Sequence, residues 1–178
     1  INDINRAYSG EKLEPEGYTS YDLALDNRDA LAGDIYKNAE NYYKSVFEHA
    51  GGSISFYPDK NGAAPTAELY HRETRSISVQ NVKEFCKKHG ITENVFFISA
   101  FGITLGKYNF KENAVFTTIY HGRNDSRLSD TVGMLVKTLP VYCDFSGQTQ
   151  EYLADVQQQL MDSMNNDIYP FSQISREF

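Results

Sequence analysis

Residues 114–145 read AVFTTIYHGRNDSRLSDTVGMLVKTLPVYCDF and carry a clear β signal. Two runs within them, Val115–Tyr120 and Met134–Phe145, are rich in β-branched and aromatic residues, and each predicts a strand. The intervening HGRNDSR combines Gly, Asn, Asp and Ser with two arginines, which is the composition of a polar loop. Binding residues concentrate on loops that a rigid scaffold positions, so we expect function near this loop.

Lys137 is the unusual residue of the second predicted strand. Side chains alternate between the two faces of a strand, so Lys137 is expected to share a face with apolar residues, namely Leu135, Leu139, Val141, Cys143 and Phe145. An ammonium group on such a face must find a partner, reach an edge or line a wet cavity. Pro140 cannot donate to the ladder and indicates an edge strand or a bulge. The sequence leaves open whether Lys137 lines a cavity or ends at the surface.

Composition indicates one soluble globular domain. The 178 residues are 40% hydrophobic and 23% charged. The net charge of -7 argues against nucleic acid or an anionic membrane as the main partner, and no apolar run is long enough to span a bilayer. Cys86 and Cys143 lie in apolar patterns, so we expect buried free thiols of a cytoplasmic protein. The chain starts with Ile1 rather than Met, so we expect a piece of a longer protein.

Helical periodicity is clear in several parts of the chain. Apolar residues recur at spacings of three and four over Asp26–His49, over a segment from Ser78 to Gly90, and over Gln150–Met164. Ser78 is placed to cap its helix, and Thr92 is placed to cap a further one. The helix after Thr92 is apolar almost all the way round, so we expect it to be buried on most sides.

The remaining segments complete an α/β pattern. Thr66–Val79 interleaves charged residues with strand formers and predicts an edge or one-sided strand, and residues 51–65 form a turn-rich connector and candidate subdomain boundary. Helical structure is expected to break at Pro170. The order strand, helix, helix, strand, strand, helix predicts a mixed β-sheet covered by helices.

Isolated chemical motifs are weak. In GITLGKY, residues 102–108, the glycine spacing is too short for a phosphate loop, and Tyr stands where Ser or Thr would hold magnesium. The histidines are scattered without the pairings of a zinc site, and no Gly-x-Ser-x-Gly elbow is present. Arg123 and Arg127 have two interpretations: each binds an anion through a forked contact, or pairs with Asp125 and Asp130 at the surface.

Several segments in sequence order carry a family resemblance. IYHGRNDSRLSDTVGMLVKTLPVY, residues 119–142, contains a Gly-Arg loop at Gly122 and a Val-Gly-Met pattern that ends in Thr-Leu-Pro. The others are GYTSYDLAL with Tyr21 and Asp22, the Tyr42-Tyr43-Lys44 signature, HGITENVFFISAFGITLGKY, and NNDIYPFSQI with Asp167, Pro170 and Phe171. Together they resemble the condensation domains of nonribosomal peptide synthetases. The ordered set is more specific than any one segment.

The resemblance implies one lobe of a two-lobed α/β enzyme with the chloramphenicol-acetyltransferase-like fold. Residues 1–50 would form an arm and inter-lobe helix region, and residues 51–178 part of the C-terminal lobe. The wall of the tunnel between the lobes would include Arg123, Gly133, Lys137 and Thr138. In this family an acceptor amine attacks a donor acyl thioester and forms an amide.

The same resemblance implies the partners. Carrier proteins would deliver both substrates on phosphopantetheine arms, and no cofactor or metal would be bound directly. The missing N-terminal lobe and adjacent synthetase domains would be further partners.

The chain also departs from the family pattern. The catalytic His-His-x-x-x-Asp-Gly motif of the family lies upstream of Tyr21, and nothing before Gly17 resembles it, so the catalytic histidine is expected outside this chain. The chain alone is therefore expected to be inactive. Lys137 stands where the family usually has Asn, and Tyr142 where an Arg is often found. Open alternatives are an epimerisation, cyclisation or ester-forming relative of the same fold, or a noncatalytic docking module for carrier proteins.

A single lobe is expected to expose an apolar face, which predicts self-association of the chain. Static light scattering at high protein concentration should give a mass above that of the monomer. A clean monomer over the whole concentration range would contradict this expectation.

Overall fold

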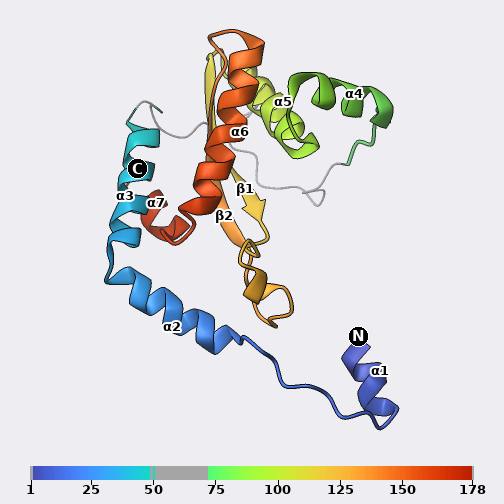
Figure 1. Ribbon diagram of the computed structural model, residues 1–178. Helices are drawn as coiled ribbons and strands as arrows, with labels where there is room; N and C mark the ends of the chain where they lie inside the picture. The colour runs from blue at the N-terminus through green and yellow to red at the C-terminus, as the bar shows by residue number, and fades with distance from the viewer. Residues whose placement is uncertain (1, 49, 51–71, 178) are drawn as a thin grey trace, which may run out of the picture.

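An antiparallel pair of strands lies at the centre of the computed structural model, which describes residues 2–48, 50 and 72–177 (Figure 1). Strand β1, Asn113–Tyr120, pairs with β2, Lys137–Asp144, in a register that runs from Asn113↔Asp144 to Tyr120↔Lys137. Both predicted strands are confirmed. β2 begins later than expected, because Met134 and Val136 are exposed and precede the ladder.

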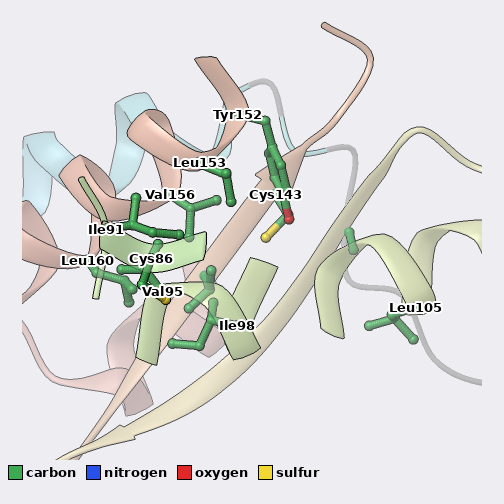
Figure 2. Close-up of a cluster of buried hydrophobic side chains, with 12 residues drawn as sticks. Cys86, Ile91, Val95, Ile98, Leu105, Cys143, Tyr152, Leu153, Val156 and Leu160 are labelled. Atoms are coloured by element: carbon green, nitrogen blue, oxygen red, sulfur yellow. The ribbon is translucent and has the colours of Figure 1, made fainter. Parts of the chain in front are cut away.

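The main core lies between one face of this sheet and helices α5, Glu93–Tyr108, and α6, Thr149–Asn165. Figure 2 shows side chains from these elements and from α4, Val79–His89, converging on a single apolar cluster. Its members include Cys86, Ile91, Val95, Ile98, Ala114, Val141, Cys143, Tyr152, Val156 and Leu160. Both cysteines are free and buried, as the sequence predicted. Burying apolar side chains contributes about 25 cal/mol per Å², so this cluster is the main source of stability.

The glycines of GITLGKY let α5 pack closely on β2. A Cβ at Gly102 would lie 2.6 Å from the Cys143 Sγ, and one at Gly106 would lie 2.4 Å from a Phe145 ring carbon. Both positions are inside a helix and buried, which excludes a phosphate loop there. α5 is less enclosed than predicted, because Phe97 and Phe101 are about half exposed.

Local signals set the ends of α4 and α5 as predicted. The Ser78 hydroxyl accepts a hydrogen bond from the Asn81 amide, and α4 ends before Gly90, whose φ is 67°. The Thr92 hydroxyl likewise accepts from the Val95 amide at the start of α5. The helix predicted over Gln150–Met164 is α6.

The helix predicted over Asp26–His49 is wrong in extent, because two helices occupy this region. α2, Ser20–Leu31, begins earlier at a reciprocal cap: the Thr19 hydroxyl accepts from the Asp22 amide, and the Asp22 carboxylate accepts from the Thr19 amide at 2.9 Å. α3, Asp34–Phe47, follows after Gly33. The N-terminal segment, part of the region expected as an arm and inter-lobe helix, contains α1, Asn2–Tyr8, which Figure 1 shows apart from the sheet at the end of an extended stretch.

A second, smaller core joins α3 to α7, Phe171–Glu177. Ala39 and Tyr43 pack with Tyr169 and Ile174 there, and all four are buried. The Tyr42 hydroxyl, next along α3, donates to the Gln159 carbonyl of α6 at 3.0 Å. The break at Pro170 is confirmed, because α7 starts at the following residue.

The strand predicted over Thr66–Val79 is wrong where it is described. Residues 72–78 have no strand, and Val79 starts α4, while residues 66–71 and the predicted connector 51–65 lie outside the described part. Alternation alone does not make a strand, because a strand needs a neighbour that satisfies its backbone groups. The described sheet is therefore small and purely antiparallel, within an α/β arrangement of helices around it.

We expect Gly122→Ala to lower the free energy of unfolding by about 3 kcal/mol. The Gly122 φ is 69°, and an added Cβ would lie 1.9 Å from the Leu135 carbonyl oxygen, so the backbone must move. Gly90→Ala is the matched control, because Gly90 has a similar φ of 67° but nothing within 4 Å of an added Cβ, and it should cost about 1 kcal/mol. Urea unfolding of both variants measures the difference, and equal losses would refute the backbone clash.

The cap of α2 should depend on pH. Hydrogen bonds from Thr19 hold the pKa of Asp22 below its ordinary value. The contribution of this cap to the free energy of unfolding is therefore fully present above the pKa of Asp22 in the unfolded chain. It is lost as pH falls through the lower pKa of Asp22 in the folded chain. NMR titration of the Asp22 carboxyl carbon in wild type and Thr19→Val should show a higher pKa in the variant. An unchanged titration would show that the Thr19 hydroxyl does not bind this carboxylate.

Candidate functional site: the 121–136 loop and the hollows beneath α2

The loop between β1 and β2, residues 121–136, is held together by Arg123. Its Nη1 donates to the carbonyls of Leu128 and Thr131, the latter at 3.1 Å, and lies 3.5 Å from that of Ser129. Asp125 accepts from the Arg127 amide at 2.9 Å and starts a short 3-10 turn, Ser126–Leu128. Arg123 thus satisfies backbone carbonyls within its own loop.

This loop docks on the segment that leads into α2 through polar contacts. The Thr131 hydroxyl donates to the Tyr18 carbonyl at 2.6 Å, and the Val132 amide donates to the Glu16 Oε1 at 2.7 Å. At Gly133 an added Cβ would lie 3.3 Å from the Ser20 side chain. The loop and the N-terminal end of α2 therefore hold one another in place.

Arg127 adds a charged contact between the same two parts. Its guanidinium pairs with Asp125 at 2.6 Å and with Asp26 of α2 at 3.1 Å, and it lies 4.5 Å from the Tyr18 ring centre. The Tyr18 hydroxyl donates to the Asp26 Oδ2 at 2.6 Å. Hydrogen bonds from Arg127 lower the pKa of Asp125. Of its two sequence interpretations, Arg127 follows the pairing one, with Asp26 rather than Asp130 as the second partner.

A hollow of about 570 Å³ lies between α2, the loop, the start of β2 and the end of α6. Its wall includes Leu23 and Asn27 from α2, Gly122 and Leu135 from the two ends of the loop, and Met164 from α6. The wall mixes apolar side chains with charged groups that are already paired. A hollow of this volume is large enough for a small organic group.

Lys137 stands between this hollow and a smaller one of about 290 Å³. Its Nζ lies 2.8 Å from the Asp167 Oδ1 and 3.2 Å from the Asp167 carbonyl. Both side chains are partly buried, at 33% and 23% exposure. Of the two alternatives that the sequence left open, Lys137 follows the one in which it lines a cavity, and it also has an ion-pair partner.

The predicted tunnel and motif residues divide into two groups. Lys137, Thr138, Asp167, Pro170 and Phe171 surround the smaller hollow, although they come from two distant parts of the sequence. This group gathers because β2 begins where the α6–α7 connection crosses it, and the Lys137–Asp167 pair joins the two.

The other predicted residues have local roles. Arg123 turns into its own loop, and Gly133 is exposed beside Ser20. Tyr21 is 81% exposed on α2, and Asp22 caps that helix.

Sequence reasoning missed the contribution of α2. Asn27 lines both hollows, Leu31 lines the smaller, and Leu23 the larger. The spacing of four between these residues was a usable signal for one helical face, but the helix was predicted to start at Asp26, which hid it.

The described nucleophile and acid-base candidates sit in structural contacts. The His121 Nδ1 accepts from the Arg123 amide at 3.0 Å, and His49 and His71 lie outside the described residues. Burial raises the pKa of Cys143 to about 11, so its thiol stays protonated near neutral pH.

The described residues hold neither a cluster of metal ligands nor a helix that could span a membrane. Within residues 2–48, 50 and 72–177, no three His, Cys, Asp or Glu side chains gather as a metal site would require. Of the helices in that part of the chain, none combines the length and the apolar character needed to cross a bilayer.

The comparisons with known proteins point to the same family over nearly the whole chain. A family model described as "Condensation domain" matches residues 1–178. Nonribosomal peptide synthetase sidC of Arthroderma benhamiae is 28% identical over 176 residues, which are 97% of this chain and 3% of that protein. Bacitracin synthase 2 of Bacillus licheniformis is 25% identical, over 94% of this chain and 7% of that protein.

Solved structures agree on the fold. The first condensation domain of the calcium-dependent antibiotic synthetase, bound to a substrate analogue, has a TM-score of 0.72 at 14% identity and covers 97% of this chain. SgcC5 protein from Streptomyces globisporus has a TM-score of 0.72 at 20% identity and covers 98%.

These likenesses place the chain within a larger domain fold. It spans 39% and 40% of the two solved chains. The predicted α/β fold of chloramphenicol-acetyltransferase-like type is confirmed. The resemblance read from the ordered motifs is confirmed as well, and the chain belongs to the condensation domain family of nonribosomal peptide synthetases.

Proposed function

We propose that this chain forms one wall of an acyl-transfer passage in a condensation domain that makes amide bonds. The observation that carries the proposal is the pair of hollows beneath α2: five predicted tunnel or motif residues surround the smaller hollow, and Gly122, Lys137 and Asp167 line the larger one. The family match over residues 1–178 supports the same reaction class. The substrates would be a donor acyl or peptidyl thioester and an acceptor aminoacyl thioester, each on the phosphopantetheine arm of a carrier protein.

In this reaction the role of the wall would be to position the two substrates. The acceptor nitrogen attacks the thioester carbon, the C–N bond forms, the C–S bond breaks, and the amine proton passes to the departing thiolate. Fixing the two reactants side by side supplies much of the rate, since effective molarities of well-oriented groups are high. The partly apolar hollows suit an acyl chain, while Lys137 and Asn27 offer hydrogen bonds to its polar atoms.

The base that assists the amine would come from outside this chain. Of the two histidines in the described part, His89 is partly exposed with its Nδ1 against the Gln150 Oε1, and His121 is exposed and accepts from the loop backbone. In the proposed function a histidine of the rest of the domain faces this wall, and the chain alone is inactive. Phosphopantetheine arrives as a substrate carrier, and adjacent synthetase domains would deliver it.

A noncatalytic docking module for carrier proteins is the second candidate. The observation that favours it is that the two described imidazoles each hold a hydrogen bond and the Cys143 thiol stays protonated, so none of these groups is poised for chemistry. An epimerising, cyclising or ester-forming relative would use the same wall on other acceptors. The products of the complete synthetase distinguish these possibilities.

We expect Asn27→Trp to slow amide formation at least tenfold in the complete synthetase, because Asn27 lines both hollows and the larger indole would obstruct them. Arg28→Trp is the matched control: Arg28 is next on α2, its side chain is 69% exposed, and it should keep the wild-type rate. Mass spectrometry of products from loaded donor and acceptor carrier proteins measures the rate. Wild-type activity in a folded Asn27→Trp variant would reject the passage.

The products of the wild-type synthetase distinguish the candidate functions. A synthetase that makes no amide would favour the docking module, and an ester or epimer would favour a relative of the same fold.

A further inference from the structure

We propose that Lys137 and Asp167 make the smaller hollow selective for an uncharged acyl group over one that carries an ammonium. The inference rests on the proposed function in one respect, because it takes the ligand to be an acyl thioester. It goes further by assigning the choice between donor types to one ion pair of this chain.

The position of the Lys137 ammonium is fixed. Lys137 is the first residue of β2, and its register partner on β1 is the buried Tyr120. Its Nζ contacts both the Asp167 carboxylate and the Asp167 carbonyl. An ammonium has three N–H donors and no acceptor. Among the described residues Nζ donates only to Asp167, which leaves one N–H for a ligand.

The surroundings determine which ligand can use that donor. Of the described residues around the smaller hollow, Lys137 is the only cation and Asp167 the only anion. Their charges offset one another, so the hollow offers no net attraction to a charged ligand. The rest of the lining is largely apolar, from Leu31, Leu139 and residues 168–171.

Hydrogen-bond chemistry then separates two kinds of acyl group. A thioester carbonyl oxygen accepts from the Lys137 ammonium, whereas an α-ammonium on the acyl group has only donors and is repelled. The Asp167 carboxylate binds Lys137 through Oδ1, so an ammonium drawn to that carboxylate would lie beside the Lys137 ammonium, which repels it. With a volume of about 290 Å³, the hollow lies at the lower end of the range for ligand pockets, so a short chain fits best.

The cation of the larger hollow does not compete for this role. Arg127 is held by Asp125 and Asp26 at 2.6 and 3.1 Å, so its charge is compensated on two sides. Lys137 has a single carboxylate partner and lines both hollows. The difference in pairing makes Lys137 the group on which donor choice depends.

Three matched pantetheine probes test the proposal on the chain itself. S-hexanoyl-pantetheine carries the carbonyl, S-norleucyl-pantetheine adds an α-ammonium to the same chain length, and S-hexyl-pantetheine lacks the carbonyl. NMR titration should show the hexanoyl probe binding about tenfold more tightly than either of the others, with shifts at Leu31, Thr138 and Ile168. Equal affinities for hexanoyl and norleucyl probes, or shifts elsewhere, would overturn the proposal.

Variants of Lys137 and Asp167 test whether the preference for the hexanoyl probe depends on this ion pair. Lys137→Met leaves the Asp167 carboxylate free, so the norleucyl probe should bind more tightly than the hexanoyl probe. Lys137→Met with Asp167→Asn removes both charges and should show no preference, which keeps the test decisive if the single variant fails to fold. Lys111→Met, at an exposed position, is the control and should retain the wild-type preference. A wild-type preference in the double variant would overturn the proposal.

The outcome can be separated from that of the proposed function. If the chain prefers the hexanoyl probe but the complete synthetase makes no amide, the selectivity stands and amide formation fails. If amide forms while the probes bind equally, the passage stands and the role of Lys137 is refuted.

Discussion

The close approach of the Gly122 backbone to the Leu135 carbonyl is the constraint on which the rest of the site depends. Gly122 follows β1 and Leu135 precedes β2, so this contact closes the base of the 121–136 loop. Only a residue without a side chain can lie there, at a φ of 69°. With its base closed, the loop presents Arg123 inward to its own carbonyls and Arg127 outward to α2.

Two parts of the molecule are held together by different kinds of interaction. The sheet, α5 and α6 are joined by buried apolar side chains, and the glycines of α5 allow contacts that any larger residue would prevent. The wall that α2 contributes is different, because no residue of α2 is buried and its docking on the loop is polar. Exposed ion pairs contribute about 0–1 kcal/mol each, so this wall is less stable than the core and is the part best able to adjust to a ligand.

Much of the fold could be predicted from local patterns, and the failures have physical causes. The caps at Ser78 and Thr92 worked because a side chain three residues from its target amide needs no distant partner. The strand over residues 66–79 failed in its described part because strand formation requires a neighbour that local sequence does not supply. The start of α2 was missed because the Thr19–Asp22 cap was not recognised, and the face that lines the hollows was missed with it.

Local residue patterns were enough to predict the secondary structure around the central strands, and the ordered motifs were enough to predict the family. These features depend on residue types at short spacings, which a linear reading contains. Only the tertiary structure decided that Lys137 pairs with Asp167, that Arg123 serves its own loop and that Asn27 lines both hollows. Each of these depends on where the α6–α7 connection, the loop or α2 comes to rest, because a charged or polar side chain takes whichever partner the folded chain brings within reach.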